Sequence, residues 1–278
     1  MESNKTYKII VPYTESSAPY KKYKIEYVVE ALNRNEAKIK AENEFESYSH
    51  STSASWIRIP DLSAIRIWRV FPNDPPTPQF IDNLIKQIPC KDKNKTISIL
   101  KRLGELEDSS ASSKVISQIK EDDPQIVSTA IYTLGSIGDP TSFFAVKNAF
   151  FQKNDSEIKK AVVETLLKLA LPEDNILEFY AVAIKDKHTR DIVFRLENSV
   201  LIPIWLAEIS NEKEFEIVKN NTLKLGEKAL KVLTSLNSKH PQIFSYASKL
   251  VEILKPLATE KEWADLPTAL KKYKLYNI

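Results

Sequence analysis

Glycine is scarce in this sequence, with only four among 278 residues. Folds built mainly from strands use many glycines in turns and bulges, so the scarcity favours helices joined by polar and proline-bearing corners. Long apolar runs are also missing, since no segment approaches the about 18 consecutive apolar residues of a membrane-spanning helix. Residues 1–11 are polar and charged, unlike a signal peptide. We therefore expect a mainly helical, cytoplasmic protein without a membrane partner.

Cysteine is scarce as well, and neither sign of charge is in large excess. The single cysteine, Cys90, excludes internal disulfides and any metal site made of several cysteines. The formal net charge is +3, from 40 basic and 37 acidic residues that are interspersed along the chain. A protein dedicated to nucleic acid is usually more basic, so we do not expect nucleic acid to be the partner.

A small α+β domain is predicted at the N-terminus. Segments rich in Tyr, Val and Ile with partial alternation are typical of strands, and they occur on both sides of a helical pattern. In that pattern Ala37, Ala41 and Phe45 recur at i, i+4 and i+8, which places them on one face of a helix. The predicted elements form a β-β-α-β unit with strands at 7–13 and 22–31, a helix at 34–48 and a strand at 64–71.

Four prolines at positions 72, 75, 76 and 78 follow this unit. Proline fixes φ and cannot donate a backbone hydrogen bond, so the cluster indicates a boundary between domains. The predicted organisation is an α+β domain over 1–72, a linker over 73–79 and a helical repeat domain over 80–278.

A repeated pattern fills the rest of the chain. A Leu-Gly dipeptide recurs at 103–104, 134–135 and 225–226, and the first two lie 31 residues apart. We interpret the repeat as a helix pair that buries its apolar face only by stacking on its neighbours. The small residue of each dipeptide is expected to let the two helices of a pair approach closely, and Gly138 to end a helix in the left-handed conformation. About six helix pairs are predicted, over 94–121, 124–152, 155–185, 188–210, 212–237 and 240–272.

Two successive repeats carry a distinctive set of residues. They are Ala130, Leu134, Gly135, Ile137, Gly138, Asp139 and Pro140 in one repeat and Asp155, Glu157, Ile158, Ala161, Leu166 and Leu169 in the next. With these residues the chain resembles a known family, the HEAT-like repeat of the phycobilisome lyase class. The likeness spans roughly 94–170 and implies a mainly α fold, a HEAT-like α-solenoid. Such repeats occur in bilin lyases, in phycobilisome-degradation factors and in adaptors, so the resemblance implies no single activity.

Residues suited to catalysis are hard to find. The three histidines are not followed by glutamate, so the paired His-Glu iron site of HEAT-repeat hydroxylases is missing, and no glycine-rich loop is present to hold a phosphate. Cys90 lies beside lysines, which give only weak support for a reactive thiol, and a structural role is the simpler interpretation. We assign no catalytic residue and no metal site, and we favour a protein without a cofactor.

An aromatic pattern in residues 143–151 is the strongest binding signal. Phe143 and Phe150 form one column at i, i+7, and Phe144 and Phe151 form a second, with Lys147 between them. A repeat helix needs one core column, so the second is expected to line a partner groove on the second-helix layer. Tyr180 and Trp205 fall at comparable positions and are also predicted to bind the partner. The alternative is that all these aromatic residues pack inside the protein.

The first functional hypothesis is therefore a non-catalytic scaffold or adaptor that binds a protein or peptide partner on the solenoid surface. The alternative, implied by the resemblance alone, is a bilin lyase or chaperone that handles a linear tetrapyrrole, with a phycobiliprotein or another multi-subunit assembly as partner. A nucleic-acid-binding role ranks third because the charges are nearly balanced.

Overall fold

The computed structural model describes residues 4–50, 57–72, 76–171, 176–236 and 241–254. The chain divides into two compact units, Met1–Pro172 and Glu173–Ile278. Their border falls inside the third predicted helix pair, 155–185. Among the described helices, none combines the length and apolar character needed to cross a membrane.

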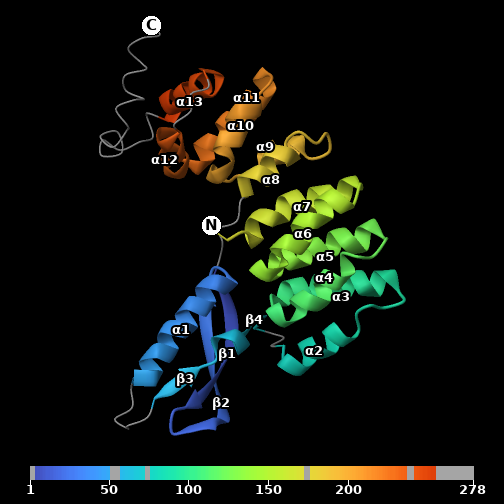
Figure 1. The fold of residues 1–278 in the computed structure, drawn as a ribbon, viewed down its shortest axis with the longest axis vertical. Helices are drawn as coiled ribbons and strands as arrows, with labels where there is room; N and C mark the ends of the chain where they lie inside the picture. The colour runs from blue at the N-terminus through green and yellow to red at the C-terminus, as the bar shows by residue number, and fades with distance from the viewer. Residues whose placement is uncertain (1–3, 51–56, 73–75, 172–175, 237–240, 255–278) are drawn as a thin grey trace. The chain divides into compact units, whose positions relative to one another are not determined.

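The first unit begins with an antiparallel sheet and one helix, drawn in blue and cyan in Figure 1. Strand β1 (Lys5–Glu15) is central, and β2 (Ala18–Ala31) pairs along one of its edges. The other edge is shared by β4 (Arg66–Val70), which pairs with Thr6–Ile10, and by β3 (Arg58–Pro60), which pairs with Tyr13–Glu15. Helix α1 (Arg34–His50) follows β2.

This sheet corrects the predicted β-β-α-β unit. The predicted third strand, 64–71, is confirmed as β4 in a shorter form, but β3 was not predicted. Strand β3 has only three residues, too few to show alternation, and it owes its conformation to pairing with β1. The unit is therefore β-β-α-β-β, with the last two strands sharing one edge of β1.

The core of the sheet explains its sequence pattern. Every second residue of β1, from Tyr7 to Tyr13, is buried and packs in one cluster with Ala37, Ala41 and Phe45 of α1. The side chains of a strand alternate between faces, so β1 directs one row of apolar groups against the helix. The two alanines carry little bulk, which allows α1 to lie close to the sheet.

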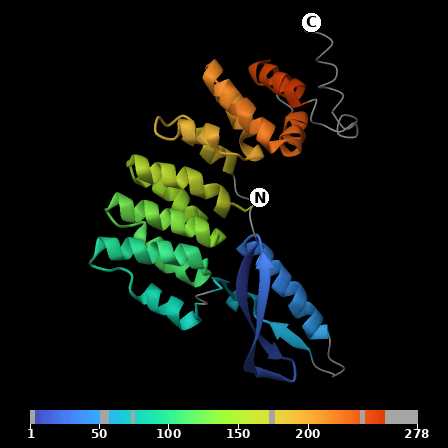
Figure 2. The same ribbon diagram turned by 180° about the vertical axis from the view of Figure 1, so that it is seen from behind.

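The remaining helices of the first unit form two layers (Figures 1 and 2). The first layer contains α3 (Lys93–Leu106), α5 (Pro124–Ile137) and α7 (Ser156–Leu169), which pack side by side in that order. The second contains α4 (Ser112–Gln118) and α6 (Phe143–Gln152), which pack against α5 and α7 respectively. Helix α2 (Pro78–Lys86) precedes and contacts α3. Stacked pairs of this kind are the HEAT-like arrangement that the repeats predict.

Aspartates start the first-layer helices. Asp92, Asp123 and Asp155 each accept hydrogen bonds from two backbone amides of the following turn, at 2.8–3.2 Å. Such caps satisfy amides that have no partner inside the helix. At the other end of α5, Gly138 has a φ of +68° and its amide bonds to the Leu134 carbonyl, as the sequence predicts. The repeat boundaries are therefore encoded locally.

The glycines of the Leu-Gly dipeptides have a different role from the predicted one. A Cβ atom added at Gly104 on α3 would lie 3.4 Å from the Thr133 Cα on α5, and one at Gly135 on α5 would lie 2.6 Å from the Thr165 Cγ2 on α7. The close approach is thus between first-layer helices of successive repeats, and the predicted contact within a pair is wrong. Gly226 differs again, because it stands between two helices with a φ of +51°.

The second unit is described through six helices, which are α8 (Ile176–Ala183), α9 (Arg190–Arg195), α10 (Ile202–Glu208), α11 (Glu212–Leu225), α12 (Glu227–Ser235) and α13 (Pro241–Leu254). The predicted pairs 188–210 and 212–237 contain α9 with α10 and α11 with α12. Pro203 lies in the first turn of α10, where its missing amide costs nothing. The second helix of the predicted pair 240–272 lies outside the described residues, so six pairs stay a prediction. Short 3₁₀ turns occur at Leu62–Ala64, Ser109–Ala111, Pro140–Ser142 and Ser199–Leu201.

Candidate functional site

Helix α6 separates its four phenylalanines into two columns, as the sequence predicts. Phe143 and Phe150 are buried, with exposed fractions of 2% and 4%. Phe144 and Phe151 are exposed by 65% and 58%. Their exposure is confirmed, while their predicted role in partner binding stays a prediction.

Each of the two exposed rings packs against a buried ring of the same helix. The Phe144 ring meets the Phe143 ring edge-on at a centroid distance of 5.3 Å, and the Phe151 ring meets the Phe150 ring in the same way at 5.4 Å. Lys147 lies between them along the helix, with its Nζ 5.9 Å from the Phe143 ring centroid. Seven residues at 1.5 Å rise separate the two exposed rings by about 10 Å along the axis. We call Phe144, Lys147 and Phe151 the α6 face.

Two other predicted partner-binding residues do not reach the surface, which corrects their placement. Tyr180 on α8 and Trp205 on α10 are both fully buried. The Trp205 indole donates a hydrogen bond of 2.8 Å to the Val193 carbonyl. Helices α8 and α10 have eight and seven residues, so large aromatic side chains supply much of the apolar volume that these short helices contribute to the core.

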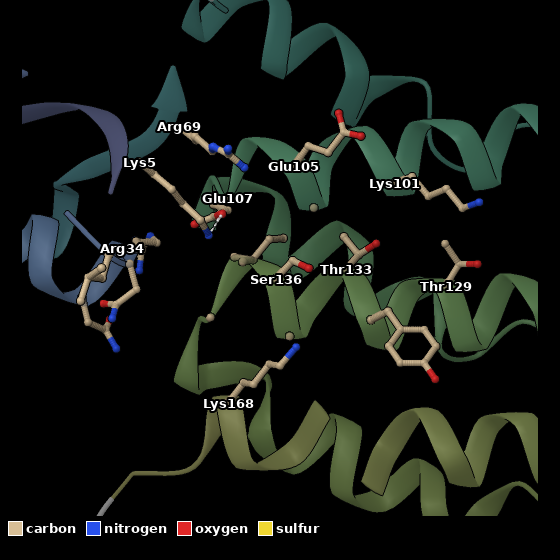
Figure 3. A pocket seen from close by; sticks show the side chains of 18 residues that line it. Lys5, Arg34, Arg69, Lys101, Glu105, Glu107, Thr129, Thr133, Ser136 and Lys168 are labelled. Carbon is tan, nitrogen blue, oxygen red and sulfur yellow. Dashed lines mark hydrogen bonds and ion pairs between the residues drawn. The ribbon is translucent and has the colours of Figure 1, made fainter. Parts of the chain in front are cut away.

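A large hollow lies on the first-layer helices, whereas the sequence predicts a groove on the second layer. Its volume is about 810 Å³, and its walls come from β1, β4, the start of α1, and helices α3, α5 and α7. Figure 3 shows this hollow with the side chains that line it. Neither Phe144 nor Phe151 is among the lining residues. We call it the basic hollow because most of the charged side chains that line it are cationic.

Cations dominate the lining of the basic hollow. Five cationic side chains face two carboxylates, those of Glu105 and Glu107. Glu105 pairs with Arg102 at 2.8 Å, and Glu107 pairs with Lys5 at 2.8 Å. The other four cations have no ion pair with any described residue. They are Arg34, Arg69, Lys101 and Lys168.

Arg34 carries the most constrained of these charges. Its Nη2 donates to the Ser109 hydroxyl at 2.7 Å, but its Nε is buried without a hydrogen-bond partner among the described residues. Burial lowers the pKa of the guanidinium from its usual value, and the carboxylates of Asp139, Asp108 and Glu107 act in the opposite direction. Arginine keeps its proton regardless, so an unpaired buried donor remains at the edge of the hollow.

Glu107 joins the sheet to the first repeat. Its backbone has a φ of +54°, a conformation that glutamate rarely adopts, at the position where Gly138 ends the next first-layer helix. Its carboxylate accepts hydrogen bonds from Lys5 at 2.8 Å and from the Tyr7 hydroxyl at 2.6 Å. Burial raises the pKa of Tyr7, and the Glu107 bond raises it further, so the phenol stays protonated. This cluster is a structural anchor.

Asp108 and Arg66 extend the same junction. The buried Asp108 carboxylate accepts from the Arg66 Nε at 2.8 Å, and Arg66 also reaches Asp82 on α2 at 2.9 Å. These ion pairs join strand β4 to α2 and to the 3₁₀ turn before α4 within one compact unit. The boundary predicted at 73–79 includes residues 73–75, which lie outside the described residues, and the domain division stays a prediction.

Within the described residues, no three His, Cys, Asp or Glu side chains gather as a metal site. Cys90 is a free thiol of intermediate exposure, and its carbonyl accepts a hydrogen bond from Thr96. The hydroxyls of the hollow belong to Thr129, Thr133, Ser136 and Tyr132, of which Thr133 donates to the Leu100 carbonyl and Tyr132 to Glu164. Cations with hydroxyls suit the binding of an anionic group.

Comparisons with known proteins give only distant likenesses. No family model matches the chain, and no curated protein matches it. Among solved structures, human deoxyhypusine hydroxylase in complex with glycerol is similar at 15% identity, over 64% of this chain and 75% of that one, with a TM-score of 0.32. An engineered protein is similar at 12% identity, over 63% of this chain and 96% of that one, also with a TM-score of 0.32. Scores this low establish neither a shared fold nor a shared function.

Proposed function

We propose that this protein is a non-catalytic adaptor that binds a partner protein through the α6 face. The observation that carries the proposal is the exposure of Phe144 and Phe151, at 65% and 58%, on one side of a single helix. Scattered exposed apolar residues are normal on proteins, but two phenylalanines two turns apart form a ready pair of anchors.

The α6 face is prepared for binding by the rings beneath it. Because Phe144 rests on Phe143 and Phe151 on Phe150, each exposed ring has a packed neighbour that restricts its rotamers. A side chain that is already ordered loses less conformational entropy when a partner covers it. An aromatic side chain buries about 150–250 Å² when fully covered, so the pair would form the centre of an interface.

Lys147 indicates the chemistry of the partner surface. Lys147 lies between the two anchors along the helix, and its ammonium group is 5.9 Å from the centroid of the Phe143 ring. A partner that covers both rings must either pair this charge or leave it access to water, because an unpaired buried charge is costly. We expect two apolar pockets about 10 Å apart, with a carboxylate between them.

The test uses the full chain as bait in an extract of its native cells, followed by titration with the purified captured protein. The double variant Phe144→Ala/Phe151→Ala should fold like the wild type, because both side chains are largely exposed. Each truncated anchor should weaken binding by about 2 kcal/mol, or roughly 30-fold. Titration calorimetry measures the dissociation constant.

A matched control is available on α2. Phe80 is 42% exposed in the same unit, so Phe80→Ala makes the same chemical change away from the α6 face. This variant should retain partner binding. Equal binding by the wild type and the double variant, with both folded, would refute the α6 face, and so would equal loss in the Phe80 control.

The bilin lyase or chaperone stays the alternative proposal, supported by the family resemblance of the repeats. It implies that a linear tetrapyrrole binds to the protein. Mixing the purified chain with a bilin and recording the visible spectrum tests this alternative, because a bound tetrapyrrole changes its absorbance on entering a protein site.

A further inference from the structure

We propose that the basic hollow is a second binding site, and that its ligand is an extended acidic segment of a protein. The site lies on the first-layer helices and is separate from the α6 face. The inference deepens the proposed function and rests on it only in taking a protein as the ligand.

The cationic side chains of the lining outnumber its carboxylates, so the hollow keeps a net positive charge. Arg34, Arg69, Lys101 and Lys168 have no ion-pair partner among the described residues, while both lining carboxylates already have one. The whole chain carries only +3, so this hollow concentrates positive charge that the rest of the surface balances. Cations along a concave surface raise the local concentration of an anionic ligand.

The start of α1 adds to this potential. Asn33 caps the helix by accepting a hydrogen bond from the Glu36 amide, and Asn33, Arg34 and Asn35 all line the hollow. A helix N-terminus carries partial positive charge and free amides. The Arg34 guanidinium, held on the Ser109 hydroxyl by its Nη2, adds a full positive charge beside this helix end.

Residues with small side chains form the bottom of the hollow. Gly104 and Gly135 line it together with Thr129, Thr133 and Ser136, which follow one face of α5. The two glycines have no side chain and the three hydroxyl side chains are short, so little of the space above the helices is filled. Backbone of a bound chain can therefore approach the helices closely.

The spread of charge favours an extended ligand over a single small anion. Lys101 is on α3 and Lys168 is on α7, with α5 between them, and Figure 3 shows both side chains at the hollow. Two interhelical spacings amount to roughly 16–20 Å. An extended peptide covers this distance with about five or six residues.

A protein segment fits better than a single-stranded nucleic acid. Proteins that bind single strands present aromatic rings on which bases stack. Of the described lining residues, Tyr132 is the single aromatic, and its hydroxyl is already held by Glu164 at 2.7 Å. Carboxylates spaced along a peptide match lysine and arginine without needing a stacking surface.

The experiment measures fluorescence anisotropy of a labelled eight-residue peptide of alternating Glu and Ser with the full-length protein. The Glu peptide should bind, and the same peptide with Gln in place of Glu should bind at least about tenfold more weakly, because charge supplies the attraction. Binding should weaken as salt rises from about 0.05 M to 0.2 M, since the cations are partly exposed. No binding of the Glu peptide up to about 1 mM would overturn the proposal.

Two double variants test whether peptide binding depends on the lysines of the hollow or only on the net charge of the protein. Lys101→Gln/Lys168→Gln removes two exposed lining cations and should weaken Glu-peptide binding about tenfold. Lys95→Gln/Lys160→Gln changes the net charge equally on the same two helices, but neither lysine lines the hollow. The control should bind within about twofold of the wild type. Equal weakening by both pairs would overturn the site.

Further measurements distinguish binding at the hollow from binding at the α6 face, and a peptide ligand from a nucleic acid. The Phe144→Ala/Phe151→Ala variant should bind the Glu peptide as the wild type does. If the Glu peptide fails to bind while the α6 face still captures its partner, the hollow proposal falls and the adaptor proposal stands. Tighter binding of a single-stranded oligonucleotide than of the Glu peptide, lost in Lys101→Gln/Lys168→Gln, would replace the peptide with nucleic acid as the ligand.

Discussion

Two glycines at matching repeat positions should respond to alanine with opposite signs. Alanine in place of glycine inside a helix stabilises it by about 0.5–1 kcal/mol, because the unfolded chain has less freedom to lose. At Gly104 a new Cβ would lie 3.4 Å from its nearest neighbour, an ordinary contact. Gly104→Ala should therefore raise the free energy of unfolding by about 0.5–1 kcal/mol.

At Gly135 the same change meets a packed neighbour. The new Cβ would lie 2.6 Å from the Cγ2 of Thr165, a side chain that is 1% exposed and β-branched. Overpacking of this kind costs about 1–3 kcal/mol, which exceeds the gain in helix propensity. Gly135→Ala should lower the free energy of unfolding by about 1 kcal/mol, with α5 and α7 pushed apart.

Urea unfolding followed by circular dichroism measures both changes. Thr165→Ser removes the clashing methyl group, so the Gly135→Ala/Thr165→Ser double variant should recover most of the loss relative to Thr165→Ser alone. Stabilisation of similar size by Gly104→Ala and Gly135→Ala would show that α5 and α7 do not approach as closely as described.

Three further predictions concern the phenylalanine columns, the anchor at Glu107 and the second unit. Phe143→Ala should cost about 3–5 kcal/mol of stability and Phe144→Ala less than about 0.5 kcal/mol, since only Phe143 is buried; equal losses in urea unfolding would contradict the two-column description. Tyr7→Phe should cost about 1.5–3 kcal/mol, because it removes a buried hydrogen bond to the Glu107 carboxylate, and an unchanged thermal midpoint would argue against the anchor. In the second unit, hydrogen bonds from Arg190 lower the pKa of Glu214 from 4.5 to about 2. A carboxyl group whose pKa is lowered by folding stabilises the protein above its unfolded-state pKa, and this contribution is lost on acidification. The free energy of unfolding should therefore fall between about pH 4.5 and 2. Glu214→Gln should remove this pH dependence in acid unfolding curves.

Local features of the sequence predict local features of this fold well. The Asp-Pro sequence at Asp123 and the glycine at Gly138 mark the two ends of α5, because a cap and a left-handed residue act within one turn. The spacing of Phe144 and Phe151 likewise predicts that they share one face. Their exposure follows because Phe143 and Phe150 occupy the core side of α6.

Features that depend on distant segments escape the same reasoning. The basic hollow combines β1, β4, α1, α3, α5 and α7, and no local pattern brings these elements together. Glu107 did carry a signal, since it stands 31 residues before Gly138 at the equivalent helix end. A charged residue where the repeat expects glycine indicates a side chain held by something else, here Lys5 and Tyr7. The prediction that Tyr180 and Trp205 bind a partner at the surface fails for a similar reason, since both are buried. A short helix has few apolar residues to fill the core beside it, and local spacing does not show which of its aromatic side chains is needed there.

Site-specific photo-crosslinking in native cells tests the adaptor role most directly. A benzoylphenylalanine in place of Phe144 positions a reactive ring on the α6 face, and one in place of Phe80 provides the control on α2. We expect one defined protein adduct from position 144 and none from position 80. Failure to form an adduct at position 144, or the same adducts from both positions, would contradict the account.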